Sequence, residues 1–506
     1  MFQILGTKHP WSLREAAHLL NRAGFGGPPE SIAQLHALGM TKAVESLLTF
    51  QDESAELVPP TWLTDEKAIE RQRSYFSERR KLNAIEDLKE RAQKRKQLQR
   101  EIRSNQREQT ADMIAWWMKR MIETNHPLRE KMTLFWHGHF ATSLQKVKQP
   151  ELLYRQNELF REHATGSFHK LTDAICEDPA MMLYLDTNQN KKGKPNENFA
   201  RELLELFTLG EGNYTETDIK EAARAFTGYT IDRRRSKSSF DRRKHDRDEK
   251  TVLGATGNFM GDDIVRIALE QDTCARFLTT KLWEFFVAEN PDKEIIDHLA
   301  ALFRENEYAV RPVLHAIFTS KAFYDERLIR THIKSPVQFL VQLARQLEIP
   351  SIPLNVVTTA LSSLGQALFF PPNVAGWEGG KSWINTNTLL TRYNIAGLLV
   401  KGASDPKHMQ TVMKGGNKQM FSRKKQGELR HYDGPNMDKL APQALRETPP
   451  ELVKALTYRL FQDDLTPKHR ENFDSYAESK KDERFTDAEV AELLHLMMST
   501  PYYQLT

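Results

Sequence analysis

Helical periodicity is the feature of this chain that most restricts its possible folds. Apolar residues recur three and four positions apart over segments such as 13–23, 264–287 and 336–347, whereas the alternation typical of strands is scarce. The pattern predicts an all-α protein built as a multi-helix globular array. A chain of 506 residues is long enough for several packed subdomains.

Shifts in composition divide the chain into four segments. We expect an N-terminal helical segment (1–60), a charged helical arm (61–110), a central helical core that contains the candidate site (111–400), and a polar linker followed by C-terminal helices (401–506). Within the arm, a thin apolar stripe accompanies dense charge of both signs, which predicts a long exposed helix or helical hairpin. Its acidic residues are interleaved and its aromatic residues are few, so a solvated helix is favoured over a nucleic-acid-binding arm.

The overall composition excludes several classes of protein. The net charge of +4 comes from 72 basic and 68 acidic residues, which is too nearly balanced to indicate a nucleic-acid partner by itself. Two cysteines exclude a disulfide framework and a thiolate metal cluster. The sequence has neither a signal-peptide pattern nor a run of roughly 20 apolar residues, the length of a membrane span. We therefore expect a cytoplasmic protein.

The stretch from Asp186 to Thr230 holds the densest set of polar side chains. In the helix predicted after Pro195, Glu197, Arg201 and Glu205 are spaced four apart, and Glu202 lies within the same arc. In water, each pair of such a ladder stabilises a helix by only about 0.2–0.5 kcal/mol. If another layer covers this face, the same residues form a buried acid–base network with perturbed pKa values.

A second helix is predicted after Gly210. Thr215 and Asp218 resemble a capping box, and Asp218 and Arg224 share the polar side of this helix. The two helices would present carboxylate and guanidinium groups to a common cleft, into which we expect His139 to hydrogen-bond. The candidate catalytic residues are His139, Arg201, Glu202, Glu205, Asp218 and Arg224.

The approach to the first of these helices has the spacing of a calcium loop. If Asp186 is position one, then Asn188, Asn190 and Glu197 fall at positions three, five and twelve, where an EF-hand places oxygen ligands. A divalent cation, calcium, is therefore the candidate cofactor. Against it, position six is Lys191 rather than glycine, and two more lysines follow closely. The alternative is an Asx-rich turn that caps the helix.

Three motifs resemble those of the bacterial domain-of-unknown-function family DUF1800. They are residues 16–26 (AAHLLNRAGFG), 135–140 (FWHGHF) and 195–206 (PNENFARELLEL). The resemblance covers most of the chain to about residue 399 and implies no particular reaction. It also implies an alkaline-phosphatase-like partner protein. Where many relatives carry a histidine, this chain has Phe207, which argues against a haem or metal scheme that needs an imidazole there.

These observations lead to three hypotheses about function. The first is an enzyme with a buried site, in which Glu202 or Glu205 is the general base or metal ligand, Arg201 binds an anion and His139 shuttles protons. The second is a non-catalytic scaffold or partner of an alkaline-phosphatase-like protein, with residues 66–108 as the docking element. The third, nucleic-acid binding through this arm and Arg233 to Arg235, has least support. The first requires the charged groups after Pro195 to be shielded from water and to face His139.

Overall fold

The protein is all-α, as predicted, with two small two-stranded sheets among the residues that the structure describes. The computed structural model describes residue 3 and residues 10–50, 58–63, 65–232, 237–402, 432–462, 465–479 and 484–506. Arg233 to Arg235 and most of the predicted polar linker, residues 403–431, lie outside this set. Within it, no helix is long and apolar enough to cross a lipid bilayer.

The first hydrophobic core lies beneath the N-terminal helices and the helices that follow α6. Helix α1 begins at a capping box, in which Ser12 accepts a hydrogen bond from the backbone and Glu15 reaches back to residue 12. Apolar faces of these helices, fully buried at residues such as Trp136 and Phe207, form this core. The helices are α1 (Leu13–Ala23), α2 (Pro29–Ala37), α3 (Met40–Leu48), α6 (Pro127–His139), α9 (Phe168–Cys176), α10 (Pro179–Tyr184), α11 (Asn198–Glu202), the π-helical η3 (Leu203–Leu209), α12 (Glu216–Ala225), α13 (Gly261–Leu269), α14 (Asp272–Phe286), α15 (Lys293–Glu305) and α16 (Val310–Phe318).

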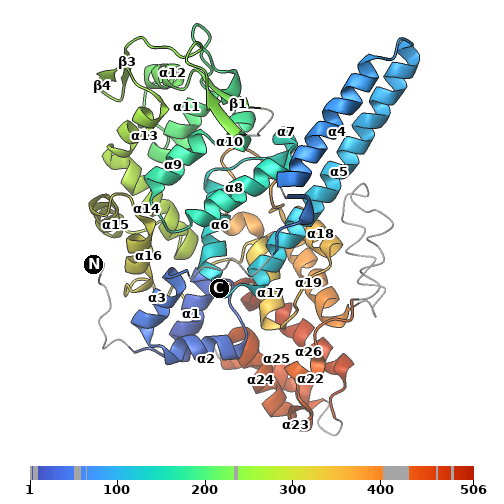
Figure 1. The fold of residues 1–506 in the computed structure, drawn as a ribbon. Coiled ribbons are helices and arrows are strands. Elements are labelled where there is room, and N and C mark those ends of the chain that lie inside the picture. Colours follow the sequence, from blue (N-terminus) through green and yellow to red (C-terminus); the bar gives the residue numbers. More distant parts are fainter. Residues whose placement is uncertain are drawn as a thin grey trace.

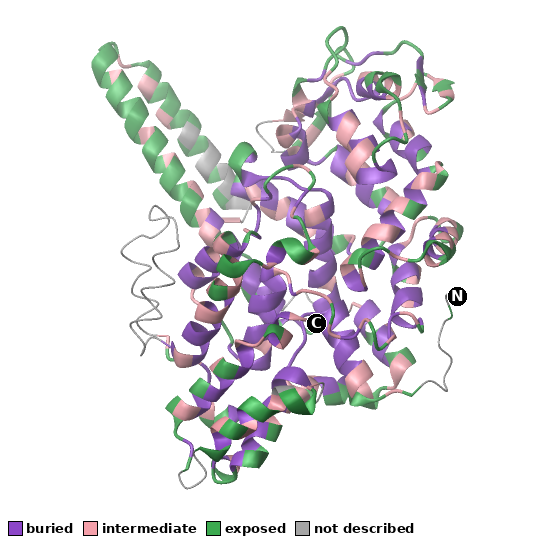
Figure 2. Ribbon diagram, turned by 180° about the vertical axis from the view of Figure 1, so that it is seen from behind, coloured by how far each residue is buried: buried purple, intermediate pink, exposed green. Residues whose placement is uncertain are grey.

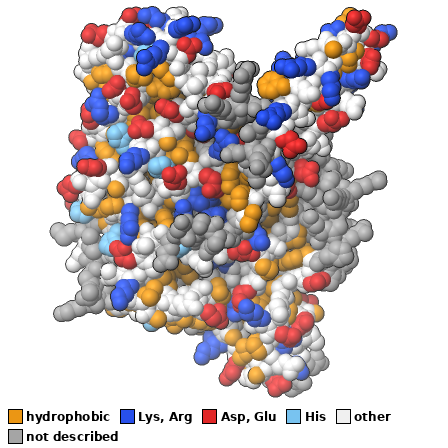
Figure 3. Space-filling view, in the orientation of Figure 1, with side chains coloured by type: hydrophobic (Ala, Val, Ile, Leu, Met, Phe, Trp, Pro, Cys, Tyr) orange, Lys and Arg blue, Asp and Glu red, His pale blue; other side chains and the backbone are white. Residues whose placement is uncertain are grey.

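The charged arm is a helical hairpin of α4 (Asp65–Asn83) and α5 (Leu88–Glu123) that projects from the body (Figure 1). Lys, Arg, Asp and Glu side chains all lie on its surface (Figure 3). Asp87 caps α5 by accepting hydrogen bonds from two backbone amides. From Thr110 onward the same helix is mostly buried, so α5 carries the exposed arm into the core.

The second core joins the buried end of α5 to the C-terminal third of the chain. It is continuous with the first around α6, because Leu134 packs in this core while Met132 and Phe135 pack in the other. Figure 2 shows the buried residues running through the interior of both parts. The remaining helices are α7 (Leu144–Val147), α8 (Pro150–Glu162), α17 (Pro336–Gln346), α18 (Leu354–Leu364), α19 (Thr386–Lys401), α22 (Met437–Leu440), α23 (Gln443–Arg446), α24 (Pro449–Phe461), α25 (Pro467–Glu478) and α26 (Asp487–Met498).

The strands are short and lie at the edge of the molecule. Antiparallel β1 (Tyr229–Asp232) and β2 (Lys237–Phe240) form one hairpin, and β3 (Lys250–Val252) and β4 (Ala255–Gly257) form the other. β3 packs against α12. A separate contact matters more for the interior: Ile333 pairs with Leu505, so the last residues of the chain lie beside the segment that leads into α17.

Candidate functional site

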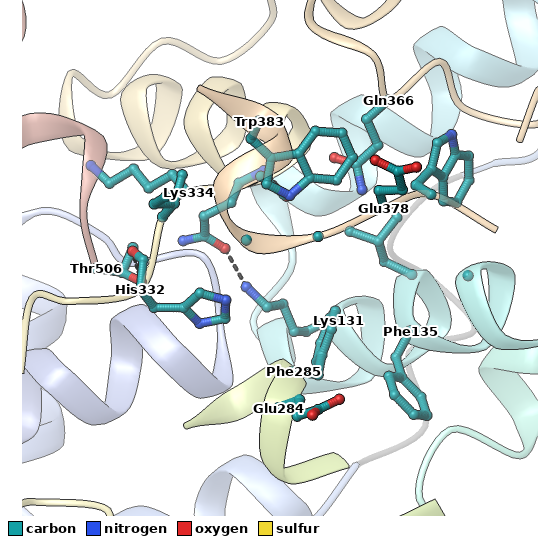
Figure 4. Close-up of a pocket in the computed structure, with 18 of the residues that line it drawn as sticks. Lys131, Phe135, Glu284, Phe285, His332, Lys334, Gln366, Glu378, Trp383 and Thr506 are labelled. Carbon is teal, nitrogen blue, oxygen red and sulfur yellow. Dashed lines mark hydrogen bonds between the residues drawn. The ribbon is translucent and has the colours of Figure 1, made fainter. Parts of the chain in front are cut away.

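A cavity of about 430 Å³ lies where the two cores meet. Its walls come from α1, α6, α14, the segment 332–335, the start of α17, the loop 375–383 and Thr506 (Figure 4). The loop is held against α6 at Gly376, whose φ is +87° and whose Cα approaches the Gly138 carbonyl so closely that a Cβ would lie 2.2 Å from that oxygen. The volume is that of a small-molecule site.

Three buried cations line this cavity without an acidic partner. Lys334 is 1% exposed, and its Nζ has no hydrogen-bond partner and lies 3.8 Å from the centre of the Tyr503 ring. Lys131 donates to the amide oxygen of Gln338, and Arg22 donates to backbone carbonyls. Over the described part of the chain, the contacts of these three side chains include no salt bridge.

Burial without a counterion destabilises the charged forms of these side chains. It lowers the pKa of Lys131 to about 7, with a smaller contribution from the nearby Arg22, and it lowers the pKa of Lys334 well below its usual range. Lys281, on α14, has a pKa lowered to about 8 by burial. Lys131 and Lys281 can therefore exchange protons near neutral pH.

The π-helical segment η3 positions two groups of the cavity wall. His139 Nε2 lies 3.0 Å from the Phe207 carbonyl, and Lys281 Nζ lies 3.2 Å from the Leu206 carbonyl. A carbonyl only accepts hydrogen bonds, so Nε2 carries the proton and Nδ1 of the neutral ring is a bare acceptor. This Nδ1 is buried and has no partner, and burial lowers the pKa of His139 well below its usual range.

The charged helix after Pro195 forms a different set of contacts. Arg201 binds Glu216 through two hydrogen bonds of 2.8 Å and reaches Glu197 at 3.4 Å. Glu205 accepts a hydrogen bond from the Tyr214 hydroxyl. The Arg201 and Glu216 side chains are 34% and 66% exposed, so this is a network at the molecular surface.

The other predicted residues stabilise the local fold. Glu202 is half-buried, which together with Glu205 raises its pKa. Asp218 closes the capping box with Thr215 and accepts a hydrogen bond of 2.7 Å from the Leu253 amide. Its carboxylate therefore caps α12 and anchors the β3–β4 hairpin.

Arg224 of α12 forms a salt bridge with Asp246, in the loop before β3. Its guanidinium donates to Asp246 at 2.9 Å and to Glu221 at 2.6 Å, and this pairing holds the pKa of Asp246 below its usual range despite partial burial. Among the described contacts, none joins His139 to the other five predicted residues. The structure thus places His139 at the cavity and distributes the rest among surface networks and caps.

The loop with calcium-like spacing engages most of its proposed ligands elsewhere. Asp186 pairs with Lys146 at 2.7 Å, and Glu197 lies near Arg201. Asn190 accepts from the Asn196 amide and donates to the Ala223 carbonyl. Only Asn188 Oδ1 is buried without a partner, and no group of three or more His, Cys, Asp or Glu side chains in the described residues could hold a metal. In this arrangement three of the four proposed ligands, Asp186, Asn190 and Glu197, already contact other protein groups.

Sequence reasoning missed most of the cavity. Arg22 stands in the 16–26 motif, which was noted for its family resemblance, whereas Lys131, Lys281, Lys334 and Trp377 were not predicted. The available signal was a lysine among apolar residues: Lys131 precedes the run Met-Thr-Leu-Phe-Trp in α6. Nothing in the sequence indicates that segments as far apart as α1 and Thr506 meet.

Comparisons with known proteins identify a family and no activity. A family model described as "Protein of unknown function (DUF1800)" matches residues 18–505, nearly the whole chain. No curated protein and no solved structure matches this chain. The chain belongs to the DUF1800 family.

Proposed function

We propose that the central cavity binds a small molecule with an anionic group and that the protein acts on it as an acid–base enzyme. The observation that supports this most is the set of buried cations, Arg22, Lys131 and Lys334, without an acidic partner. Leaving a buried charge unpaired costs several kcal/mol. An anionic ligand would supply the missing partner, and unpaired, perturbed groups in a cavity are typical of functional sites.

The same cavity contains groups suited to proton transfer. With a pKa of about 7, the Lys131 amine is neutral in roughly half the molecules at pH 7. His139 offers a bare Nδ1, and its orientation is fixed by the Phe207 carbonyl. We assign His139 as the general base and Lys131 as an anion-binding group whose proton the ligand stabilises. The surface network around Arg201 takes no part in this chemistry.

Calorimetric titration with inorganic phosphate, sulfate and acetate tests the proposal. We expect at least one of these anions to bind the wild-type protein. The substitution Lys334→Met, which keeps the volume and removes the charge, should weaken binding at least tenfold. Lys170→Met, an exposed lysine on α9, is the matched control and should change nothing. Absence of binding by all three anions, or equal binding by the Lys334→Met protein, would contradict the proposal.

The arm supports a second role, docking to an acidic protein. Lys89, Lys96, Arg100, Arg103 and Arg107 are exposed and lie seven, four, three and four residues apart, which places them in one row along α5. An alkaline-phosphatase-like partner is the candidate for this surface.

Neutralising part of the row to glutamine tests the docking role. Replacing residues 96, 100, 103 and 107 should abolish co-purification with such a partner. Replacing the exposed residues 73, 79, 80 and 81 of α4 is the control, because it removes as many charges from the other helix of the arm. Equal loss in both proteins would indicate net charge rather than a docking face.

A further inference from the structure

The cavity wall carries carboxylates as well as cations. Lys334 and His332 lie together at one end in Figure 4, and Glu378 lies toward the other end, beside Trp383. Glu284 is also on the wall, below Lys131 in the same view. In the described residues no salt bridge joins a cavity cation to a cavity carboxylate, although Lys281 lies close enough to Glu284 for their charges to interact.

The acidic side is formed by α14 and the loop that covers it. Glu289 lies against Gly380, where a Cβ would meet its carboxylate oxygen at 1.9 Å. Burial, and then the charge of Glu289, raise the pKa of Glu284. Glu284, Glu289 and Glu378 are each partly exposed, so they line the mouth of the cavity, whereas Lys131 and Lys334 are buried in its wall.

Aromatic rings accompany these carboxylates. Trp377 and Trp383 flank Glu378 on the loop, and Phe135 and Phe285 come from the opposite wall. Carboxylates beside the faces of aromatic rings are a favourable environment for an ammonium group, which gains from both the charge and the ring quadrupole.

We infer that the ligand is a zwitterion, with an anionic group against Lys131 and Lys334 and an ammonium group against Glu378 beside the tryptophans. The inference rests on the proposed function and names its substrate class. A ligand with negative charge alone would leave the acidic mouth unpaired and would be repelled by it on entry. The cavity volume of about 430 Å³ lies within the range of sites that bind small molecules.

Matched pairs of ligands test the inference by calorimetry. Phosphoethanolamine is compared with ethyl phosphate, and 4-aminobutyrate with butyrate, which differ by the ammonium group and together distinguish a phosphate from a carboxylate. We expect the zwitterion of at least one pair to bind the wild-type protein about tenfold more tightly. Because the carboxylates are partly solvated, a much larger factor is not expected.

The substitution Glu378→Gln, in an exposed loop, should remove this preference while leaving the affinity for ethyl phosphate or butyrate unchanged or higher. Glu305→Gln, at an exposed position at the end of α15, is the control. Equal affinity within both pairs, or a preference that survives this substitution, would overturn the inference. Failure of every anion to bind would instead overturn the proposed function.

Discussion

Replacing Lys131 by methionine should stabilise the ligand-free protein at pH 7. The pKa of this buried amine falls from 10.5 to about 7. At about 1.4 kcal/mol per pH unit, the charged amine therefore destabilises the folded state by about 5 kcal/mol at low pH. Methionine removes this cost and keeps most of the packing volume. It also leaves the Gln338 amide oxygen without its donor, which costs about 1–3 kcal/mol.

The effect of this substitution should depend on pH in a defined direction. Between pH 7 and 10.5 the unfolded chain holds the Lys131 proton more tightly than the folded protein does, so the wild-type protein gains stability as pH rises. The advantage of the variant should therefore shrink by about 1.4 kcal/mol per pH unit. We expect a net stabilisation of about 2–4 kcal/mol near pH 7. This is the destabilisation by the buried charge, about 5 kcal/mol, minus about 1–3 kcal/mol lost with the hydrogen bond to Gln338. Near pH 10.5 this becomes a small destabilisation.

Thermal unfolding of both proteins at pH 7, 8, 9 and 10 measures this difference. For a chain of this length the expected change in Tm at pH 7 is an increase of about 2–4 °C, since larger proteins shift less per kcal/mol. Lys170→Met is the control and should give a Tm difference that does not vary with pH. A Lys131→Met protein that is less stable than wild type by the same amount at every pH would refute the conclusion that Lys131 is buried without an acidic partner.

Three further predictions concern the cavity loop, a buried ion pair and the loop with calcium-like spacing. Gly376→Ala should lower stability by about 2–4 kcal/mol and weaken anion binding, because its Cβ would collide with the Gly138 carbonyl. Gly379→Ala in the same loop, where a Cβ has nothing within 4 Å, is the control for stability. Glu130 binds Arg161 at 2.6 Å and Arg120 at 2.8 Å in the interior, so Glu130→Gln should destabilise by about 3–5 kcal/mol in thermal unfolding. These partners lower the pKa of Glu130 to about 2, so its contribution is present above pH 4.5 and lost as pH falls to 2, a loss that the variant should lack. Calcium at millimolar concentration should leave the Tm unchanged relative to EDTA, since Asp186 and Asn190 already bind protein groups. An increase in Tm that Asn188→Ala abolishes would instead show that this loop binds calcium.

The helices could be predicted because each depends on local sequence. The Thr215–Asp218 capping box forms as expected, and the thin apolar stripe of the arm gives a hairpin. These features follow from spacing and from residues within one or two turns of each other. The all-α fold with its projecting arm is therefore confirmed.

The contacts of Glu197, Arg201 and Glu205 could not be predicted, because the prediction assumed a regular α-helix with 100° per residue. Residues Leu203–Leu209 form a π-helix, in which each turn is wider, so the predicted pairing fails after Glu202. Glu205 binds Tyr214 instead, and Arg201 finds its closest partner, Glu216, on the next helix. The same π-helix directs the Phe207 carbonyl toward His139.

The cavity is a product of tertiary structure alone. Arg22, Lys131, Lys281 and Lys334 each look like an ordinary charged position on an amphipathic helix or in a loop. Their burial depends on the meeting of α1, α6, α14 and the segment before α17, which no local pattern encodes. A sequence reveals such a site only once the packing of the helices is known.

An anion located by anomalous scattering gives the most direct test of the central claim. Crystals grown or soaked in selenate or bromide would show whether the buried cations hold an anion. We expect a peak in the cavity within about 3–3.5 Å of Lys334 Nζ, a hydrogen-bonding or ion-pairing distance, with Lys131 nearby. A cavity without such a peak, with Lys334 Nζ bonded to an acidic group of the protein, would contradict the account.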